Sequence, residues 1–262
     1  MKRQVKSNKR SLISRWAFTC WIACFLVVVA SIPAGGARRE TIFSSPRQHS
    51  LTIHFRHRVG SRDLKLFDET YTNSFGEPMT ITRFSYYVSH LRVTGVDHRQ
   101  WPLSDKTYLI DEADSSSKTL ILPFSGGAIQ SISFEIGVDS ILNVSGVQTG
   151  DLDPLKGMFW TWNSGYIFAK LEGRSDSSHA PAHYLNWDIG GFKSPANASR
   201  KIVIVVPVQS TTASVMVIDA DLLKWFEGQH LLKIAQHPLC HQPGELAMQV
   251  ADNYSSMFSI EP

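Results

Sequence analysis

Hydrophobic and polar residues alternate along much of this 262-residue chain, as expected for strands with one buried face. In the clearest stretch, the alternation divides an apolar set from a polar set: Leu51, Ile53, Phe55, His57 and Val59 against Thr52, His54, Arg56 and Arg58. We therefore predict a half-buried strand in which His57 faces inward and His54 faces solvent. An inward histidine serves either as a hydrogen-bonded core residue or as a ligand, and the pattern leaves both open.

Further segments with strand character follow, separated by turn signals rich in Gly, Pro and Asn. They span residues 81–93, 107–110, 119–122, 129–136, 158–171, 182–188, 201–207 and 214–218. Many short strands without alternating helices favour a mainly β fold, here an antiparallel β-sandwich. Two C-terminal helices are expected, one capped by Asp219 or Asp221 and ending before Gly228, the other over residues 243–258.

The densest aromatic stretch is GMFWTWNSGYIFAKLEG, residues 157–173. At strand spacing, Met158, Trp160 and Trp162 would share one face. Large aromatic rings on one face are typical of a packed core, and they also suit a redox or ligand site because indoles are electron-rich and oxidisable. The residues alone do not decide between these two interpretations.

The N-terminal region reads as a secretory leader. A basic segment precedes an apolar run over residues 16–32, and small residues follow up to Ala37. We predict a signal peptide over residues 1–37, a polar linker over 38–50 and one domain over 51–262. The apolar run is also close to spanning length, so an uncleaved leader is the only membrane association expected.

The net charge argues against nucleic-acid binding, and the cysteine content argues against a disulfide-stabilised domain. The leader holds six Lys or Arg, so the remainder has 20 basic against 23 acidic residues, and no nucleic-acid-binding face is predicted. Removing the leader leaves Cys240 alone, which excludes an internal disulfide. Cys240 lies between His237 and His241, so it is either a small buried group or a soft metal ligand.

Local catalytic and metal motifs are absent from the sequence. The chain has no His-Glu-x-x-His, no paired Cys-x-x-Cys and no Gly-x-Ser-x-Gly. A hydrolase using a histidine with Asp151 or Glu172 is the weakest hypothesis, because no nucleophile motif accompanies them. We expect a protein without catalytic turnover of its own.

Several stretches together resemble the MbnP-like family of copper-binding proteins, which are associated with methanobactin systems. The resemblance is carried mainly by residues 134–140, 143–154 and 157–167, with further matches at residues 55–57, 84–89, 108–111 and 251–253. It covers nearly the whole predicted mature chain.

The resemblance implies a periplasmic or secreted β-sandwich that holds copper at a site with an oxidised tryptophan. In relatives this tryptophan becomes kynurenine, and a di-haem partner protein of the peroxidase type carries out the oxidation. Imidazole is a good copper ligand. The positions of this chain that fit are His57 and either Trp160 or Trp162, which the resemblance places side by side.

One position departs from the family pattern. Where relatives commonly read Tyr-His-x-Gly-Gly, this chain reads Trp187-Asp188-Ile189-Gly190-Gly191. Asp188 would then stand in for a histidine ligand, and a carboxylate is a harder donor that weakens Cu(I) binding. Trp187 is a third candidate for oxidation or for simple packing.

The sequence therefore leaves two candidate functions. The first is an exported copper-binding protein whose metal residues are His57, Trp160 or Trp162, and Asp188. The second is an exported β-sandwich that binds a protein or glycan partner without metal.

Overall fold

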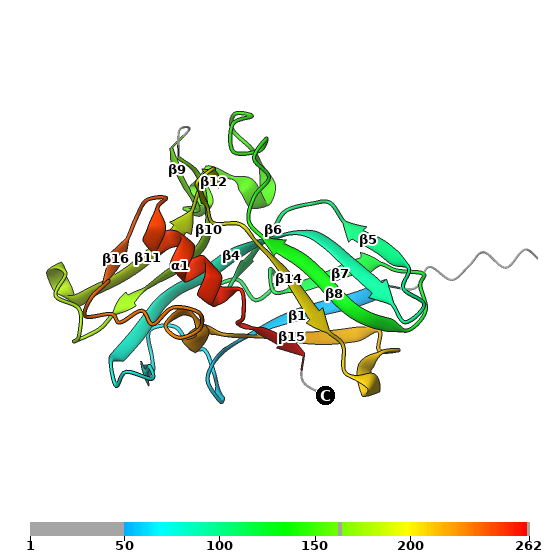
Figure 1. The fold of residues 1–262 in the computed structure, drawn as a ribbon, viewed down its shortest axis with the longest axis horizontal. Helices are drawn as coiled ribbons and strands as arrows, with labels where there is room; N and C mark the ends of the chain where they lie inside the picture. Colours follow the sequence, from blue (N-terminus) through cyan, green and yellow to red (C-terminus); the bar gives the residue numbers. More distant parts are fainter. Residues whose placement is uncertain (1–49, 162–163, 261–262) are drawn as a thin grey trace, which may run out of the picture. The chain divides into compact units, whose positions relative to one another are not determined.

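The computed structural model describes residues 50–161 and 164–260, and these residues fold as two main β-sheets packed face to face (Figure 1). In the smaller sheet the order is β17-β15-β1-β2, with β7 also paired to β1. Its strands are β1 (Ser50–Val59), β2 (Arg62–Asp63), β7 (Thr119–Pro123), β15 (Val215–Asp221) and β17 (Phe258–Ile260).

The larger sheet has the order β14-β8-β4-β10-β11-β16; β3, β5 and β6 also pair with β4, and β9 with β10. Its strands are β3 (Thr70–Thr72), β4 (Pro78–Gly95), β5 (Gln100–Ser104), β6 (Tyr108–Asp111), β8 (Ile129–Ile136), β9 (Phe159–Thr161), β10 (Gly165–Arg174), β11 (Tyr184–Gly190), β14 (Arg200–Val205) and β16 (Leu239–Cys240). The prediction of a mainly β sandwich is confirmed.

Short elements complete the described chain: the hairpin β12 (Phe192–Lys193) with β13 (Ala196–Asn197), the 3-10 turns η1 (Gly150–Leu152), η2 (Pro154–Lys156), η3 (Pro181–His183), η4 (Val208–Ser210) and η5 (Leu222–Trp225), and the helix α1 (Glu245–Tyr254). Within the described residues, no helix is long and apolar enough to cross a membrane. The predicted leader and linker, apart from Ser50, lie outside these residues.

Most strand pairs are antiparallel, as expected, but two pairs are parallel: β1 with β15, and β11 with β16. Parallel pairing of strands far apart in sequence leaves no local signal, because no tight turn joins them. The stretch 158–171, predicted as one strand, is divided into β9 and β10, and Gly165 at the start of β10 has a φ of 78°.

The C-terminal region contains one α-helix among the described residues. The first expected helix is the single turn η5, whose N-cap Asp221 accepts a hydrogen bond from the Leu223 amide, as the capping signal predicted. The second is α1, and β17 follows it where the helix was expected to continue. Phe258 of β17 packs against Phe55, Tyr86 and Phe134 in the core, so the last described residues form a strand of the sandwich.

The alternation in β1 matches its prediction. Its apolar set and His57 are buried between the two sheets, and the intervening residues from Thr52 to Arg58 are half-buried on the other side. In β4, Phe84 and Tyr86 also face this core, so Ser85 between them lies on the outer face of the larger sheet. The sheet therefore has two buried surfaces of different character.

Candidate functional site

A row of polar side chains crosses the outer face of the larger sheet. Lys170 of β10 lies directly opposite Ser85 of β4 on one side and Asp188 of β11 on the other. Side chains of directly opposed antiparallel residues share a face. The Lys170 ammonium lies 2.7 Å from Asp188 Oδ1 and 2.9 Å from Glu172 Oε1. The row thus contains a buried ion pair.

His241 joins this row through the parallel pairing of β16 with β11. The pairing sets Cys240 opposite Trp187, and the next residue, His241, has its Nδ1 3.7 Å from Asp188 Oδ2. Cys240 is buried, and burial raises the pKa of its thiol to about 11. A thiol that stays protonated is a poor metal ligand, so His241 is the better donor of the two.

Trp160 lies over the same face of β11. A Cβ atom on Gly190 would fall 2.5 Å from the Tyr166 carbonyl oxygen and 2.9 Å from Cζ3 of Trp160, which explains why a glycine fits there. Gly190 and Asp188 are two residues apart on one strand and so share a face. The structure thus places Trp160 against Gly190, two residues along β11 from Asp188, while Trp162 lies outside the described residues.

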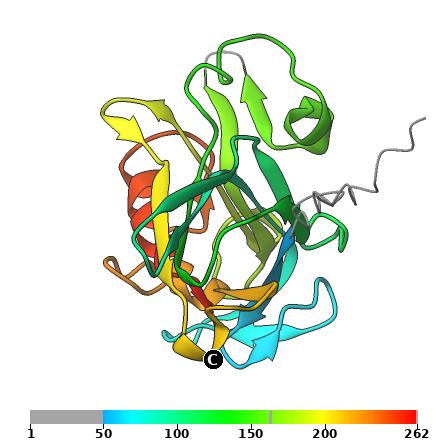
Figure 2. The ribbon, with the colours of Figure 1, turned by 90° about the vertical axis from the view of Figure 1, so that its right-hand side faces the viewer.

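Buried contacts hold the hairpin that carries Trp160. Asn143 Oδ1 accepts a hydrogen bond of 2.8 Å from the Tyr166 amide, and the Asn143 side chain also donates to the Val138 carbonyl. Tyr166 packs edge-on against Phe159 and donates its hydroxyl proton to the Leu152 carbonyl. Both β9 and the η1–η2 segment lie at the top of the views in Figures 1 and 2.

Three buried polar atoms near this row have no hydrogen-bond partner among the described residues: Ser85 Oγ, Trp160 Nε1 and Asn186 Oδ1. Ser85 is opposite Lys170, and Asn186 is opposite Glu172. Buried polar atoms are nearly always satisfied in folded proteins, by water or a ligand where no protein group serves. Their gathering on one face makes this face the candidate site.

A hollow of about 240 Å³ opens next to the row. Its lining consists of Ser164, Gly191, Phe192, Lys193, Ala196 and Pro243. Gly191 follows Gly190 directly, and Pro243 lies two residues after His241. The hollow is thus lined by sequence neighbours of Gly190 and His241.

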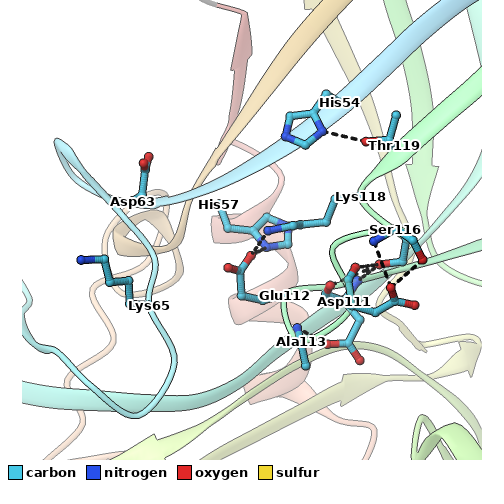
Figure 3. A network of polar contacts seen from close by, with 12 residues as sticks. His54, His57, Asp63, Lys65, Asp111, Glu112, Ala113, Ser116, Lys118 and Thr119 are labelled. Carbon is cyan, nitrogen blue, oxygen red and sulfur yellow. Dashed lines mark hydrogen bonds and ion pairs between the residues drawn. The ribbon is translucent and has the colours of Figure 1, made fainter.

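His57 belongs to a different network, on the inner face (Figure 3). Its Nδ1 lies 2.7 Å from Glu112 Oε2, and its Nε2 lies 3.0 Å from the Tyr86 hydroxyl. Glu112 Oε2 also accepts a hydrogen bond of 2.8 Å from Lys118. With a neutral ring, Nδ1 donates to the carboxylate and Nε2 accepts from the phenol, so both nitrogens are satisfied.

The electrostatics of this inner network favour that neutral ring. Burial lowers the pKa of His57, and the hydrogen bond from its ring to Glu112 only partly opposes the shift. Burial alone would raise the pKa of Glu112, but hydrogen bonds from His57 and Lys118 outweigh it and the pKa is lowered. Burial also raises the pKa of Tyr86 well above its ordinary value.

The larger sheet separates His57 from the other predicted metal residues. His57 contacts Phe84 and Tyr86, which point inward from β4, whereas Asp188 and Trp160 lie on the outer side. The structure therefore does not bring His57 beside Trp160. Trp187 also faces inward, stacks on Trp225 and donates its indole N–H to the His237 carbonyl, which is a packing role.

No three His, Cys, Asp or Glu side chains lie close enough to hold one metal ion anywhere in residues 50–161 and 164–260. The outer face offers two such donors, Asp188 Oδ2 and His241 Nδ1. A metal there would need a further donor.

The chain matches one known protein family. The sequence model of the MbnP family matches residues 48–242. The chain belongs to the MbnP family. In structure it is similar to MbnP from Methylosinus trichosporium, with a TM-score of 0.53 at 15% identity over 70% of this chain and 78% of the other. A likeness at that identity establishes the MbnP fold alone, and no curated protein matches this chain.

Sequence reasoning missed two residues of this site, Lys170 and His241. The sequence placed Lys170 in a predicted aromatic strand and gave it no role. A lysine between apolar residues of a central strand is, however, a sign of a buried charge. His241 carried no signal of its own, because its approach to Asp188 depends on a parallel pairing across about fifty residues of chain.

Proposed function

We propose that this MbnP-family chain is an exported protein that binds copper on the outer face of its larger sheet. The ligands would be Asp188 Oδ2, His241 Nδ1 and a donor atom of Trp160 or Trp162 after its oxidation to kynurenine, because an intact indole N–H has no lone pair for a metal. The observation that supports this most is that Asp188 Oδ2 and His241 Nδ1, from separate segments, lie 3.7 Å apart, while Trp160 lies against Gly190 of the strand that carries Asp188.

The chemistry of these donors fits a copper ion. Imidazole suits copper in either oxidation state, and a carboxylate adds a negative charge. The distance of 3.7 Å between Nδ1 and Oδ2 can be spanned by one ion with two bonds of about 2 Å. Bound copper would supply a redox-active centre beside the indole, while Asp188 and His241 would hold it in place.

His57 fits this role less well than the sequence implied. Both ring nitrogens already have partners within hydrogen-bond distance, and its side chain is fully buried. A metal ligand needs one nitrogen free for the ion. We therefore move the histidine ligand from His57 to His241.

The proposed localisation and the proposed partner rest on the predicted leader and on the family. Export through the predicted signal peptide would place the domain in the periplasm or outside the cell. Oxidation of a tryptophan to kynurenine would be carried out by a di-haem peroxidase-type partner, so the chain itself would not be an enzyme.

A second function stays in view because Lys170 already neutralises Asp188 without a metal. On this reading the chain is an exported module that binds a protein or glycan through the same face. The two functions differ in one respect that is directly measurable, which is stoichiometric metal binding.

The test is copper titration of the purified domain with three single variants: His241→Ala, His57→Ala and His237→Ala as the matched control. We expect His241→Ala to weaken binding about tenfold or more, as expected for loss of a ligand or of its supporting contacts. The other two variants should bind as the parent does, and intact mass would report kynurenine in protein made with its partner. Binding that is lost only in His57→Ala would reject the site proposed here, and no binding by the parent would favour the second function.

A further inference from the structure

The start of β10 is tied to the preceding segment of the chain by one buried asparagine. Asn143 is 1% exposed and lies between β8 and β9. Its Nδ2 donates hydrogen bonds of 2.9 Å to the Val138 carbonyl and 3.0 Å to the Asp139 carbonyl. Its Oδ1 accepts a hydrogen bond of 2.8 Å from the Tyr166 amide. Both amide hydrogens and the oxygen are therefore used, and they join the two segments at one point.

Gly165, the residue before Tyr166, shows how closely the asparagine fits. Gly165 has a φ of 78°, and a Cβ atom there would overlap Asn143 Oδ1 and fall 3.0 Å from Cε1 of Phe192. A side chain at this position is thus disfavoured both by the backbone conformation and by the space that Asn143 fills.

The strand pairing carries this contact to Trp160. In the antiparallel pairing of β9 with β10, Phe159 is opposite Tyr166 and Thr161 is opposite Gly165. The two residues that Asn143 contacts are therefore the partners of the two neighbours of Trp160. The indole N–H of Trp160 is buried and has no hydrogen-bond partner among the described residues. The position of the ring thus depends on where the strand is held.

We propose that Asn143 is a positioning residue, which holds β9 so that the Trp160 indole stays against Gly190 of β11. The inference rests on the proposed function only for the role of this tryptophan in copper binding. The placement of the indole by Asn143 is a property of the metal-free protein and is tested without metal.

The experiment measures how often the hairpin of β9 and β10 opens in the purified protein. Met158 is fully buried beside β9, so hydrogen peroxide oxidises it to the sulfoxide mainly when the hairpin is open. Tryptic peptide 157–170 contains Met158, and peptide 66–83 contains the buried Met79 of β4 as the reference. Asn143→Ala should raise the rate for Met158 relative to Met79 by about tenfold, because loss of a buried hydrogen bond favours the locally open state to that extent.

A second variant reaches the same contact from the other side, and two controls match the pair. Gly165→Ala should also raise the Met158 rate, since the added methyl group displaces Asn143. Gly146→Ala introduces a side chain at a similar φ of 88° but into open space. Gln148→Ala removes an amide of the same segment that donates to the Gly146 carbonyl. Both controls should keep the parent ratio of rates.

Fluorescence reports the indole itself. Difference emission spectra, recorded for each variant with and without Trp160→Phe, isolate the contribution of Trp160. In Asn143→Ala this emission should move to longer wavelength as the indole enters water, whereas in Gln148→Ala it should match the parent.

Several results would overturn the inference. An equal rise for Met158 and Met79 in Asn143→Ala would mean that the asparagine supports the whole fold and does not position the hairpin. An unchanged ratio, or the same rise in the two controls, would remove the special role of Asn143. Faster oxidation of Met158 with unchanged Trp160 emission would show that the hairpin does not set the place of the indole. Failure of copper binding alone would reject the proposed function and leave this inference standing.

Discussion

The two faces of the larger sheet each hold a buried charged group, but they are completed differently. On the inner face, His57, Glu112, Lys118 and Tyr86 satisfy one another at 2.7–3.0 Å. On the outer face, the Lys170–Asp188 pair lies beside polar atoms without partners and near the half-exposed ring of His241. A closed network stabilises a fold, whereas buried polar atoms without a protein partner are satisfied by water or by a ligand.

The inward position of His57 was compatible with a metal ligand, whereas the contacts of its ring place it in a closed hydrogen-bond network. Burial of a histidine is compatible with metal binding only if one nitrogen is left for the ion. The Tyr86 hydroxyl occupies the position that a metal would need at Nε2 of His57. The comparison therefore predicts separate consequences for the two faces: stability depends on the inner network and ligand binding on the outer row.

The largest expected effect is on stability from the inner face. His57→Ala should lower the free energy of unfolding by about 3 kcal/mol, since it leaves a buried carboxylate and a buried phenol without their partner. Urea denaturation measures this, with His54→Ala as the control on the solvent side of the same strand. A loss below about 0.5 kcal/mol, the usual size for a surface change, would show that the network is not structural.

A smaller effect is expected on the outer face. Asp188→Asn should lower the free energy of unfolding by about 1 kcal/mol, because Lys170 keeps Glu172 as a charged partner at 2.9 Å. The same denaturation assay applies, with Glu172→Gln as the reciprocal variant. If Asp188→Asn were as damaging as His57→Ala, the two faces would not differ as the contacts indicate.

The smallest effect is a pH dependence that belongs to the inner face. His57 has a pKa below 6.5 when folded, so as pH falls below 6.5 the unfolded chain binds a proton that the folded protein does not. The free energy of unfolding should therefore decline as pH falls below 6.5, and His57 should add no pH dependence above that value. Unfolding curves at several pH values should show a shallower decline in His57→Gln than in the parent; equal slopes would mean that His57 is not the group responsible.

Strand periodicity accounts for the part of the site that could be predicted. The burial of His57 and the exposure of its neighbours follow from a period of two residues, which is a local property of the backbone. Trp160 and Asp188 were identifiable because their motifs resemble one family, whose model does match the chain. Neither the strand period nor the family motifs indicate which side chains contact His57, Trp160 and Asp188.

The sequence by itself determined the fold class, the inward side of β1, a cap at Asp219 or Asp221 and membership of the MbnP family. Each of these depends on spacing or motif within one segment. Only the tertiary structure decided that Glu112 and Tyr86 enclose His57, that Lys170 and His241 approach Asp188, and that Trp160 lies against Gly190. Those meetings depend on which strands pair and in which register, and a shift of one residue would turn every side chain to the other face.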